Sequence, residues 1–382
     1  MKKIIVIILL SVSFLASFGV SITAKADELT DNVNEQMENL DLTELDEYYE
    51  NIVGGSESAT TTIWEMLNGE FEFDFNGVGS FILNSFFVKI KSLIAPILSV
   101  IAVAVFLSFL NGTRGSFLSD SVYESIFIAC FSVIVIILIG LFTSVVINVK
   151  NDIENLTKLN EIMSPIIITL MLASGANTSA VAFKPSVAFL SGGIMQIMRV
   201  VVIPLIGVST VFGILSYFSK EIKLKKFSEL FTSVIKWIFG ITISVYGVFL
   251  TVQGIGSASY DGISVKAAKY VLSNSVPIVG GFLKDGFDIV IAGSVLIKNT
   301  VGLTTVFLIF YTLLSTVALI AAISLLLNFT ASVTESFSDE RISGFCTFLS
   351  KKLTFVLATF LIVGFMFFLT VLMMIFTANG VL

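Results

Sequence analysis

Residues 125–149 read SIFIACFSVIVIILIGLFTSVVINV and contain no charged side chain. An α-helix needs about 20 apolar residues to cross the hydrocarbon of a bilayer, so this stretch predicts a membrane-spanning helix. Further charge-free stretches of at least spanning length are residues 92–113, 162–183, 200–219, 237–260, 299–334 and 353–382. We therefore expect an all-α polytopic integral membrane protein with about six to eight transmembrane helices.

The composition of the whole chain agrees with this prediction. Of its 382 residues, 55% are hydrophobic and 13% are charged, and the mean hydropathy is +0.98. A water-soluble chain with so much apolar surface would expose large patches that aggregate. A bilayer covers such surface, so we expect the lipid bilayer to be a partner of the chain.

The residue types needed for common catalytic and metal sites are scarce. The chain has no histidine, which is the usual general base at neutral pH and the commonest metal ligand. Cys130 and Cys346 lie far apart and form no CxxC motif, so they predict buried thiols and no zinc site. Phosphate-loop and dinucleotide motifs are absent, as are patches typical of nucleic-acid binding. We expect no enzymatic activity, no cofactor and no nucleic-acid partner.

The N-terminus has the three parts of a secretory signal: two lysines, an apolar run and an Ala-Lys-Ala cleavage site. Residues 1–26 are therefore interpreted as a signal peptide, with an uncleaved first anchor as the alternative. Residues 27–91 are expected to form an acidic extracytoplasmic segment of short helices and flexible linker. Within it, residues 27–74 contain fifteen Asp and Glu and no Lys or Arg. Such a segment is either a solvated acidic face or a surface that docks on a basic partner.

The orientation of the chain follows from the lysine-rich loop 219–236, which the positive-inside rule places in the cytoplasm. This loop lies in a first membrane half, residues 92–252, and residues 299–382 supply the C-terminal transmembrane helices. If the chain starts outside the cytoplasm and residues 162–183 are re-entrant, this orientation requires six membrane crossings. They are 92–113, 125–149, 187–218, 237–252, 299–327 and 353–377.

Two regions interrupt the apolar pattern, residues 162–185 and the Gly/Pro-rich segment 253–298. The first predicts either a broken or re-entrant helix or an ordinary span with a proline near its start. The second predicts short interfacial or re-entrant helices. A pair of broken segments in opposite halves of a chain is the arrangement by which many transporters place a polar site at mid-membrane. The residues expected to break these helices are Pro165, Gly175, Pro185, Pro277, Gly280, Gly281 and Gly286.

Five charged residues near these regions are candidate intramembrane or conduit residues: Lys184, Arg199, Lys284, Asp285 and Asp288. Charge inside a membrane is costly and therefore usually functional. The alternative is that the long side chains lie at helix ends and extend to the interface. Lys284, Asp285 and Asp288 either pair with one another or face water.

Several stretches of the sequence resemble the stage III sporulation protein AE family. They are ASGANTSAVAFKP (173–185), VFLTVQG (248–254), DGISVKAAK (261–269), VPIVG (276–280) and SVLIKNTVG (294–302). The resemblance covers most of the chain after about residue 90. The segment 248–302 is its most specific part.

This resemblance implies a role in endospore formation, at the outer forespore membrane that derives from the mother cell. It implies a channel-like or secretion-like assembly that supports late forespore gene expression. The partners would be the other proteins of the stage III A sporulation operon, including a secretion-type ATPase, and forespore stage II sporulation protein Q. The alternatives are a structural anchor for partner subunits without a conduit role, or an autonomous permease.

Overall fold

The computed structural model describes residues 26–53, 58–71, 75–113, 119–218, 224–275, 280–337 and 339–379. The expected signal peptide therefore lies outside the described residues, except for Ala26, and so does Pro277. Every regular element in the described ranges is a helix, which confirms the all-α prediction.

The N-terminal part of the described chain forms three short helices, and most of the remainder forms long ones. The short helices are α2 (Ala26–Glu38), α3 (Thr43–Val53) and α4 (Ala59–Asn68). The long helices are α5 (Phe75–Gly112), α6 (Asp120–Ala173), α9 (Lys225–Ser275), α10 (Gly280–Glu335) and α11 (Glu340–Asn379). Between α6 and α9 the chain passes through α7 (Asn177–Ala188), the π-helical stretches η1 (Phe189–Met195) and η2 (Ile197–Val202), and α8 (Ile203–Phe218).

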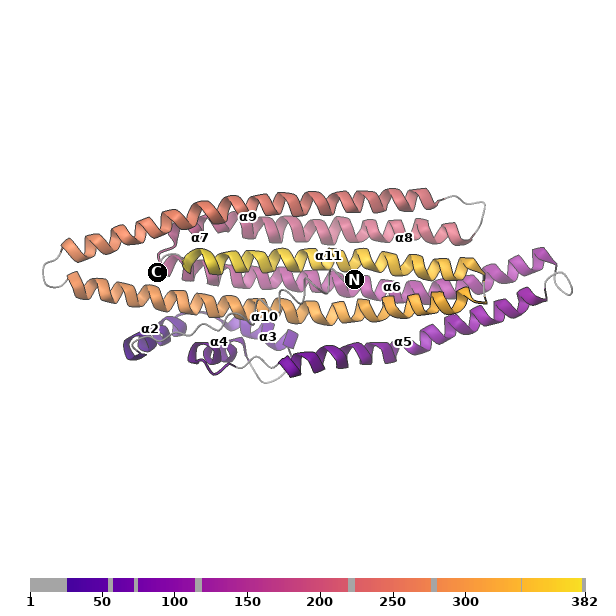
Figure 1. Cartoon of the computed structure of the whole chain (residues 1–382), viewed down its shortest axis with the longest axis horizontal. Coiled ribbons are helices and arrows are strands. Elements are labelled where there is room, and N and C mark those ends of the chain that lie inside the picture. The colour runs from indigo at the N-terminus through magenta and orange to yellow at the C-terminus, as the bar shows by residue number, and fades with distance from the viewer. Residues whose placement is uncertain are drawn as a thin grey trace.

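Six segments in the described part of the chain are long and apolar enough to cross a membrane. They are Phe86–Gly112, Asp120–Ala173, Asn177–Phe218, Lys225–Thr251, Asp285–Glu335 and Glu340–Thr377. The chain is therefore a multi-pass membrane protein, with a number of spans inside the expected range. The six segments run roughly along one axis of an elongated bundle (Figure 1).

The two ends of this bundle differ. At one end α8 finishes and α9 begins, next to the lysine-rich residues 219–236, and we call this the basic end. At the opposite end α6 gives way to α7 and α9 gives way to α10, and we call this the hairpin end (Figure 1). The short helices α2, α3 and α4 lie toward the hairpin end, below α10 in the view of Figure 1.

The long helices extend well beyond the thickness of a bilayer. α6 has 54 residues, which at 1.5 Å per residue gives a length of about 80 Å. The hydrocarbon of a bilayer is about 30 Å thick. The helix continues past its apolar stretch because Val149, Ile153 and Leu156 keep the helical spacing of a buried face through the polar residues 150–161.

Several expected helix breaks do not occur. α6 continues through Pro165, α7 continues through Pro185, and α10 continues through Gly286. Gly280 and Gly281 are the first residues of α10. Inside a helical bundle, neighbouring helices and local adjustments compensate the backbone groups that a proline leaves unpaired, so proline does not end these helices.

One further boundary differs from the one predicted. α5 begins at Phe75, so the limit drawn at residue 91 falls inside a helix. α4 occupies Ala59–Asn68, inside the segment 27–91 for which short helices and flexible linker are expected. The carboxylate of Asp46 accepts hydrogen bonds from the Thr60 backbone N–H and hydroxyl, each at 2.8 Å, and ties α3 to the start of α4.

The acidic N-terminal segment that contains α2, α3 and α4 packs on the bundle through its apolar side. Val33 and Met37 of α2 are buried, and the Ser294 hydroxyl of α10 donates a hydrogen bond to Gln36 Oε1 at 2.7 Å. The Tyr311 hydroxyl of α10 donates to the Val53 carbonyl at 3.2 Å. The exposed acidic side chains of α2 and α3 therefore lie on the outer surface of this segment.

Candidate functional site

The chain reverses sharply between α6 and α7. Gly175 has a φ of +81°, the left-handed conformation that glycine adopts at low cost. The Gly175 N–H donates to the Leu172 carbonyl at 3.0 Å, and the Ala176 N–H donates to the Met171 carbonyl at 2.9 Å. This pair of bonds is the Schellman arrangement that ends many helices. Of the residues expected to break this region, Gly175 does so, whereas Pro165 and Pro185 do not.

A carboxylate from a distant part of the chain holds the start of α7. Asp261 of α9 accepts the Thr178 N–H at 2.7 Å and the Ser179 N–H at 2.9 Å, one on each carboxylate oxygen. The side chain of Asp261 is fully buried. A negative charge that accepts the free N–H groups at a helix N-terminus is stabilised by both the hydrogen bonds and the helix dipole. Asp261 therefore fixes the direction in which α7 leaves the turn.

The same turn of α9 also packs on the reversal itself. A Cβ placed on Gly175 would lie 2.8 Å from a methyl of Val265, so the backbone of the turn and α9 are in close contact. Asp261 and Val265 are one helical turn apart and lie on one side of α9. The two family-like stretches 173–185 and 261–269, which are far apart in the sequence, thus form one packed joint at the hairpin end.

The α9–α10 hairpin is linked by an ion pair. The Lys269 ammonium lies 2.7 Å from Oδ1 of Asp288, with both side chains partly exposed. Asp285 is exposed, and the side chain of Lys284 lies outside the described residues. The partner of Asp288 is therefore a lysine of α9, which the prediction of pairing among Lys284, Asp285 and Asp288 did not include.

The other two candidate charges lie on the α7–α8 segment. Arg199, in η2, forms an ion pair with Glu154 of α6 at 2.9 Å. Lys184 is exposed on the surface of α7. π-helical turns are rare in proteins overall, but those that occur are often at functional sites. Here a π-helical turn carries Arg199, which pairs with α6. Arg199 is thus a paired charge between two helices and does not stand alone in lipid.

Two buried lysines were not predicted from the sequence. Lys298 of α10 donates to the carbonyl of Ile375 at 2.7 Å, in the last turns of α11, where the helix dipole is negative. Lys352 of α11 donates to the hydroxyls of Ser209 at 2.5 Å and Thr232 at 2.7 Å. Lys298 lies in the family-like stretch 294–302, and this position was the one feature of the sequence that could have singled it out. Lys352 comes directly before the charge-free stretch 353–382, where a flanking charge is expected.

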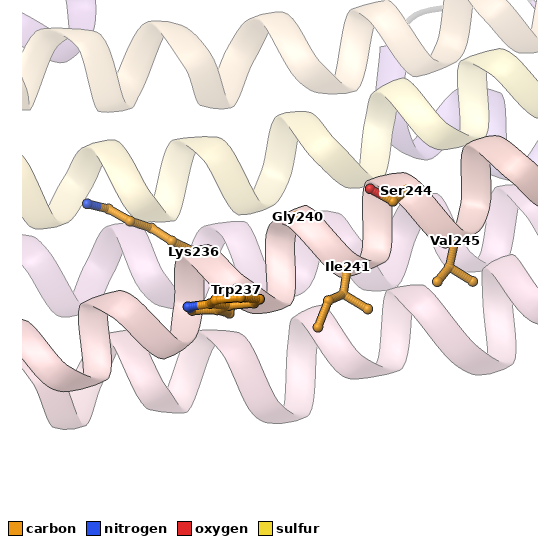
Figure 2. A pocket seen from close by; sticks show the side chains of 6 residues that line it. All are labelled: Lys236, Trp237, Gly240, Ile241, Ser244 and Val245. Atoms are coloured by element: carbon orange, nitrogen blue, oxygen red, sulfur yellow. The ribbon is translucent and has the colours of Figure 1, made fainter.

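A shallow groove runs along the outward face of α9 (Figure 2). Its lining residues are Lys236, Trp237, Gly240, Ile241, Ser244 and Val245. Trp237 is 72% exposed and lies beside Lys236, a combination typical of the membrane–water interface. The groove is mainly apolar and lies in a membrane-spanning segment, so we interpret it as lipid-facing surface.

A known protein family matches most of the chain. The family model for stage III sporulation protein AE matches residues 58–378, from the start of α4 almost to the end of α11. The chain belongs to the stage III sporulation protein AE family. A relative is the stage III sporulation protein AE of Bacillus subtilis (strain 168), 22% identical over 323 residues that cover 85% of this chain and 81% of the relative. No solved structure matches the chain.

Membership of the stage III sporulation protein AE family gives the chain a role in sporulation and confirms the resemblance seen in the sequence. The matched range contains the Gly175 reversal, Asp261, the α9–α10 hairpin and both buried lysines. It begins at α4 and leaves out α2 and α3. The joint at the hairpin end therefore lies within the family region, and the acidic helices α2 and α3 lie outside it.

Proposed function

We propose that this chain is a non-enzymatic membrane component of a channel or secretion-like complex between mother cell and forespore. It lies in the outer forespore membrane and supports late forespore gene expression. It works there with the other proteins of the stage III A sporulation operon, including the secretion-type ATPase, and with stage II sporulation protein Q of the forespore. The observation that carries the proposal is the joint in which Asp261 holds the start of α7.

This joint gives the hairpin end a defined shape. The α6–α7 reversal, the α9–α10 hairpin and the exported helices α2–α4 all lie toward this end (Figure 1). With the lysine-rich loop in the cytoplasm, the hairpin end faces the space between the two membranes. A chain that served only to cross the membrane would have no need of helices about 80 Å long that are locked together at one end.

The test is the replacement of Asp261 in the native spore-forming host. Asp261→Ala leaves the Thr178 and Ser179 N–H groups without their acceptor, and Asp261→Asn keeps one acceptor oxygen without the charge. We expect Asp261→Ala to abolish expression of a late forespore reporter and the formation of heat-resistant spores, and Asp261→Asn to reduce both. The matched control is Asp285→Asn, at an exposed carboxylate of the same end.

Membrane levels of each variant must be measured by immunoblot in the same cells. Normal spore numbers from Asp261→Ala at wild-type protein level would refute a role for this joint. If Asp261→Ala is degraded, the test rests on Asp261→Asn, whose remaining acceptor oxygen preserves more of the fold. If both variants accumulate normally, a loss of reporter activity is caused by the weakened joint and not by a lower protein level.

A purely structural anchor is the second candidate, and the positions of the charged residues favour it. Arg199 and Asp288 are paired with Glu154 and Lys269, and Lys184 is on the surface. Single replacement of Arg199, Lys184 and Asp288 by alanine separates the candidates. Loss of late reporter activity at normal protein level supports a conduit role, whereas full activity in all three variants supports the anchor.

A further inference from the structure

The outer surfaces of α7 and α9 at the hairpin end combine exposed apolar groups with lysines. Val181 is 62% exposed, Ile263 is 67% exposed and Val271 is 58% exposed. Lys184 and Lys266 are exposed on the same two helices. α7 contains no acidic residue, and the one acid of α9 beyond residue 252 is Asp261, which is buried. We call these five exposed residues the α7–α9 surface.

Part of this surface lies beyond the apolar stretch of α9. The charge-free stretch 237–260 ends before Asp261, and Val271 follows residue 260 by 11 residues along a continuous helix. At 1.5 Å per residue this position lies about 16 Å further along the axis. Lys266 and Lys269 lie between the two positions. Exposed apolar groups at such a distance, rimmed by charge, are typical of a protein contact.

The exported helices present the opposite charge. Exposed acids on α2, α3 and the residues between them are Asp31, Glu35, Glu38, Asp41, Glu44, Glu47 and Glu50. The buried side of the same helices packs on the bundle, so these carboxylates point away from it. No Lys or Arg occurs in residues 27–74 to neutralise them. We call these seven residues the acidic surface.

The two surfaces lie on opposite sides of one molecule and at the same end. In Figure 1, α7 and α9 occupy the upper side of the bundle and α2, α3 and α4 the lower side, all toward the hairpin end. The long helices α10 and α6 separate them, so the surfaces cannot meet within one chain. Complementary patches on opposite sides suit a head-to-tail contact between copies, the heterologous type of interface.

We propose that the α7–α9 surface binds the acidic surface of a second copy of this chain. The lysines Lys184 and Lys266 pair with carboxylates of α2 and α3 of the neighbour, and Val181, Ile263 and Val271 are covered by that contact. The charges steer the encounter and fix its direction, and the apolar groups supply buried area. The contact does not depend on the proposed function, because it is formed by the purified chain alone.

Charge reversal in the full-length protein tests this contact. The first variant is Lys184→Glu with Lys266→Glu, and the second is Glu35→Lys with Glu38→Lys and Glu47→Lys. Each protein is purified, reconstituted in detergent micelles and examined by sedimentation at rising concentration, at about 50 mM and about 500 mM salt. We expect the wild-type chain to self-associate at low salt, and each variant alone to do so at least about tenfold more weakly.

The decisive measurement is an equimolar mixture of the two variants. In a head-to-tail contact, the reversed lysine side of one variant matches the reversed acid side of the other, so the mixture regains association. The matched control is Lys226→Glu, which reverses an exposed lysine at the basic end and leaves self-association unchanged.

Two results overturn the proposal: a wild-type chain that stays monomeric, or a mixture that associates no better than its components. Capture of an operon partner by the α7–α9 surface of a monomeric chain would assign the surface to that partner and equally overturn the proposal. Unfolding of the variants is checked by their helicity. If the multiple reversals lose helicity, Ile263→Ser with Val271→Ser, which leaves all charges in place, is expected to weaken association as well.

Discussion

The two glycine- and proline-rich regions, 162–185 and 253–298, both reverse the chain, but they do so in different ways. In the first, three residues separate α6 from α7, Gly175 takes a left-handed conformation, and Asp261 caps the next helix. In the second, α9 runs to Ser275 and α10 begins at Gly280, and the ion pair of Lys269 and Asp288 links the two helices. The first reversal is a buried packed joint, and the contact described at the second is a partly exposed ion pair.

This difference shows which sequence features determine a tight turn in a helical bundle. Glycine content alone does not, since Gly286 lies inside α10. Proline does not either, since Pro165 and Pro185 lie inside helices. A positive φ, a close contact and a buried cap occur together at the first reversal. The predictions below test whether these three features set the two regions apart.

The largest effect is expected for Gly175→Ala. An alanine there must keep a φ of +81° and place its Cβ 2.8 Å from Val265. The left-handed conformation and the overpacking together are expected to lower the free energy of unfolding by about 2–4 kcal/mol. Equilibrium unfolding in mixed micelles, followed by circular dichroism, measures this loss.

The control for this change is Gly286→Ala in the second region. No atom lies within 4 Å of the position that a Cβ would take at Gly286, and the residue is helical. Alanine in a helix interior is favoured over glycine by about 0.5–1 kcal/mol, so this variant is expected to be more stable than wild type. Equal effects of the two substitutions would show that the reversal at Gly175 is not special.

The membrane-spanning segments follow from the sequence more readily than the rest of the fold does. Hydropathy alone indicates residues such as 125–149, because the bilayer requires long charge-free helices. The counting of crossings from the basic loop gave six, and six segments qualify in the described part of the chain. The helix ends were wrong, because residues 150–161 are polar enough to resemble a loop but amphipathic enough to continue α6.

The joint between Asp261 and the start of α7 could not be predicted from the sequence, for a different reason. Asp261 is a single acid in a polar stretch, and its role depends on Thr178 and Ser179, which lie more than 80 residues away. Lys352 was not predicted either, because its burial against Ser209 depends on the packing of α8 and α11. Contacts between distant elements leave no periodic signal along the chain. Gly175 was predictable, since glycine near a helix end is a common stop signal.

A moderate gain in stability is expected for Pro165→Ala. Pro165 is exposed and lies inside α6, where it cannot donate a hydrogen bond to the carbonyl four residues earlier. Alanine restores that bond and removes no buried contact, so the free energy of unfolding should rise by about 1 kcal/mol. The same micelle unfolding assay applies. A loss of stability would mean that the first reversal depends on this proline as well as on Gly175.

The smallest effect is expected for Lys269→Ala in the α9–α10 hairpin. The Lys269–Asp288 pair is partly exposed, so water and salt screen it, and its loss should cost no more than about 0.5 kcal/mol. The difference between variant and wild type should shrink as salt is raised from about 50 mM to about 500 mM. Unfolding curves at the two salt concentrations measure this dependence. A cost of several kcal/mol that salt leaves unchanged would mean that the hairpin is a second packed joint, and the contrast between the two regions would then fail.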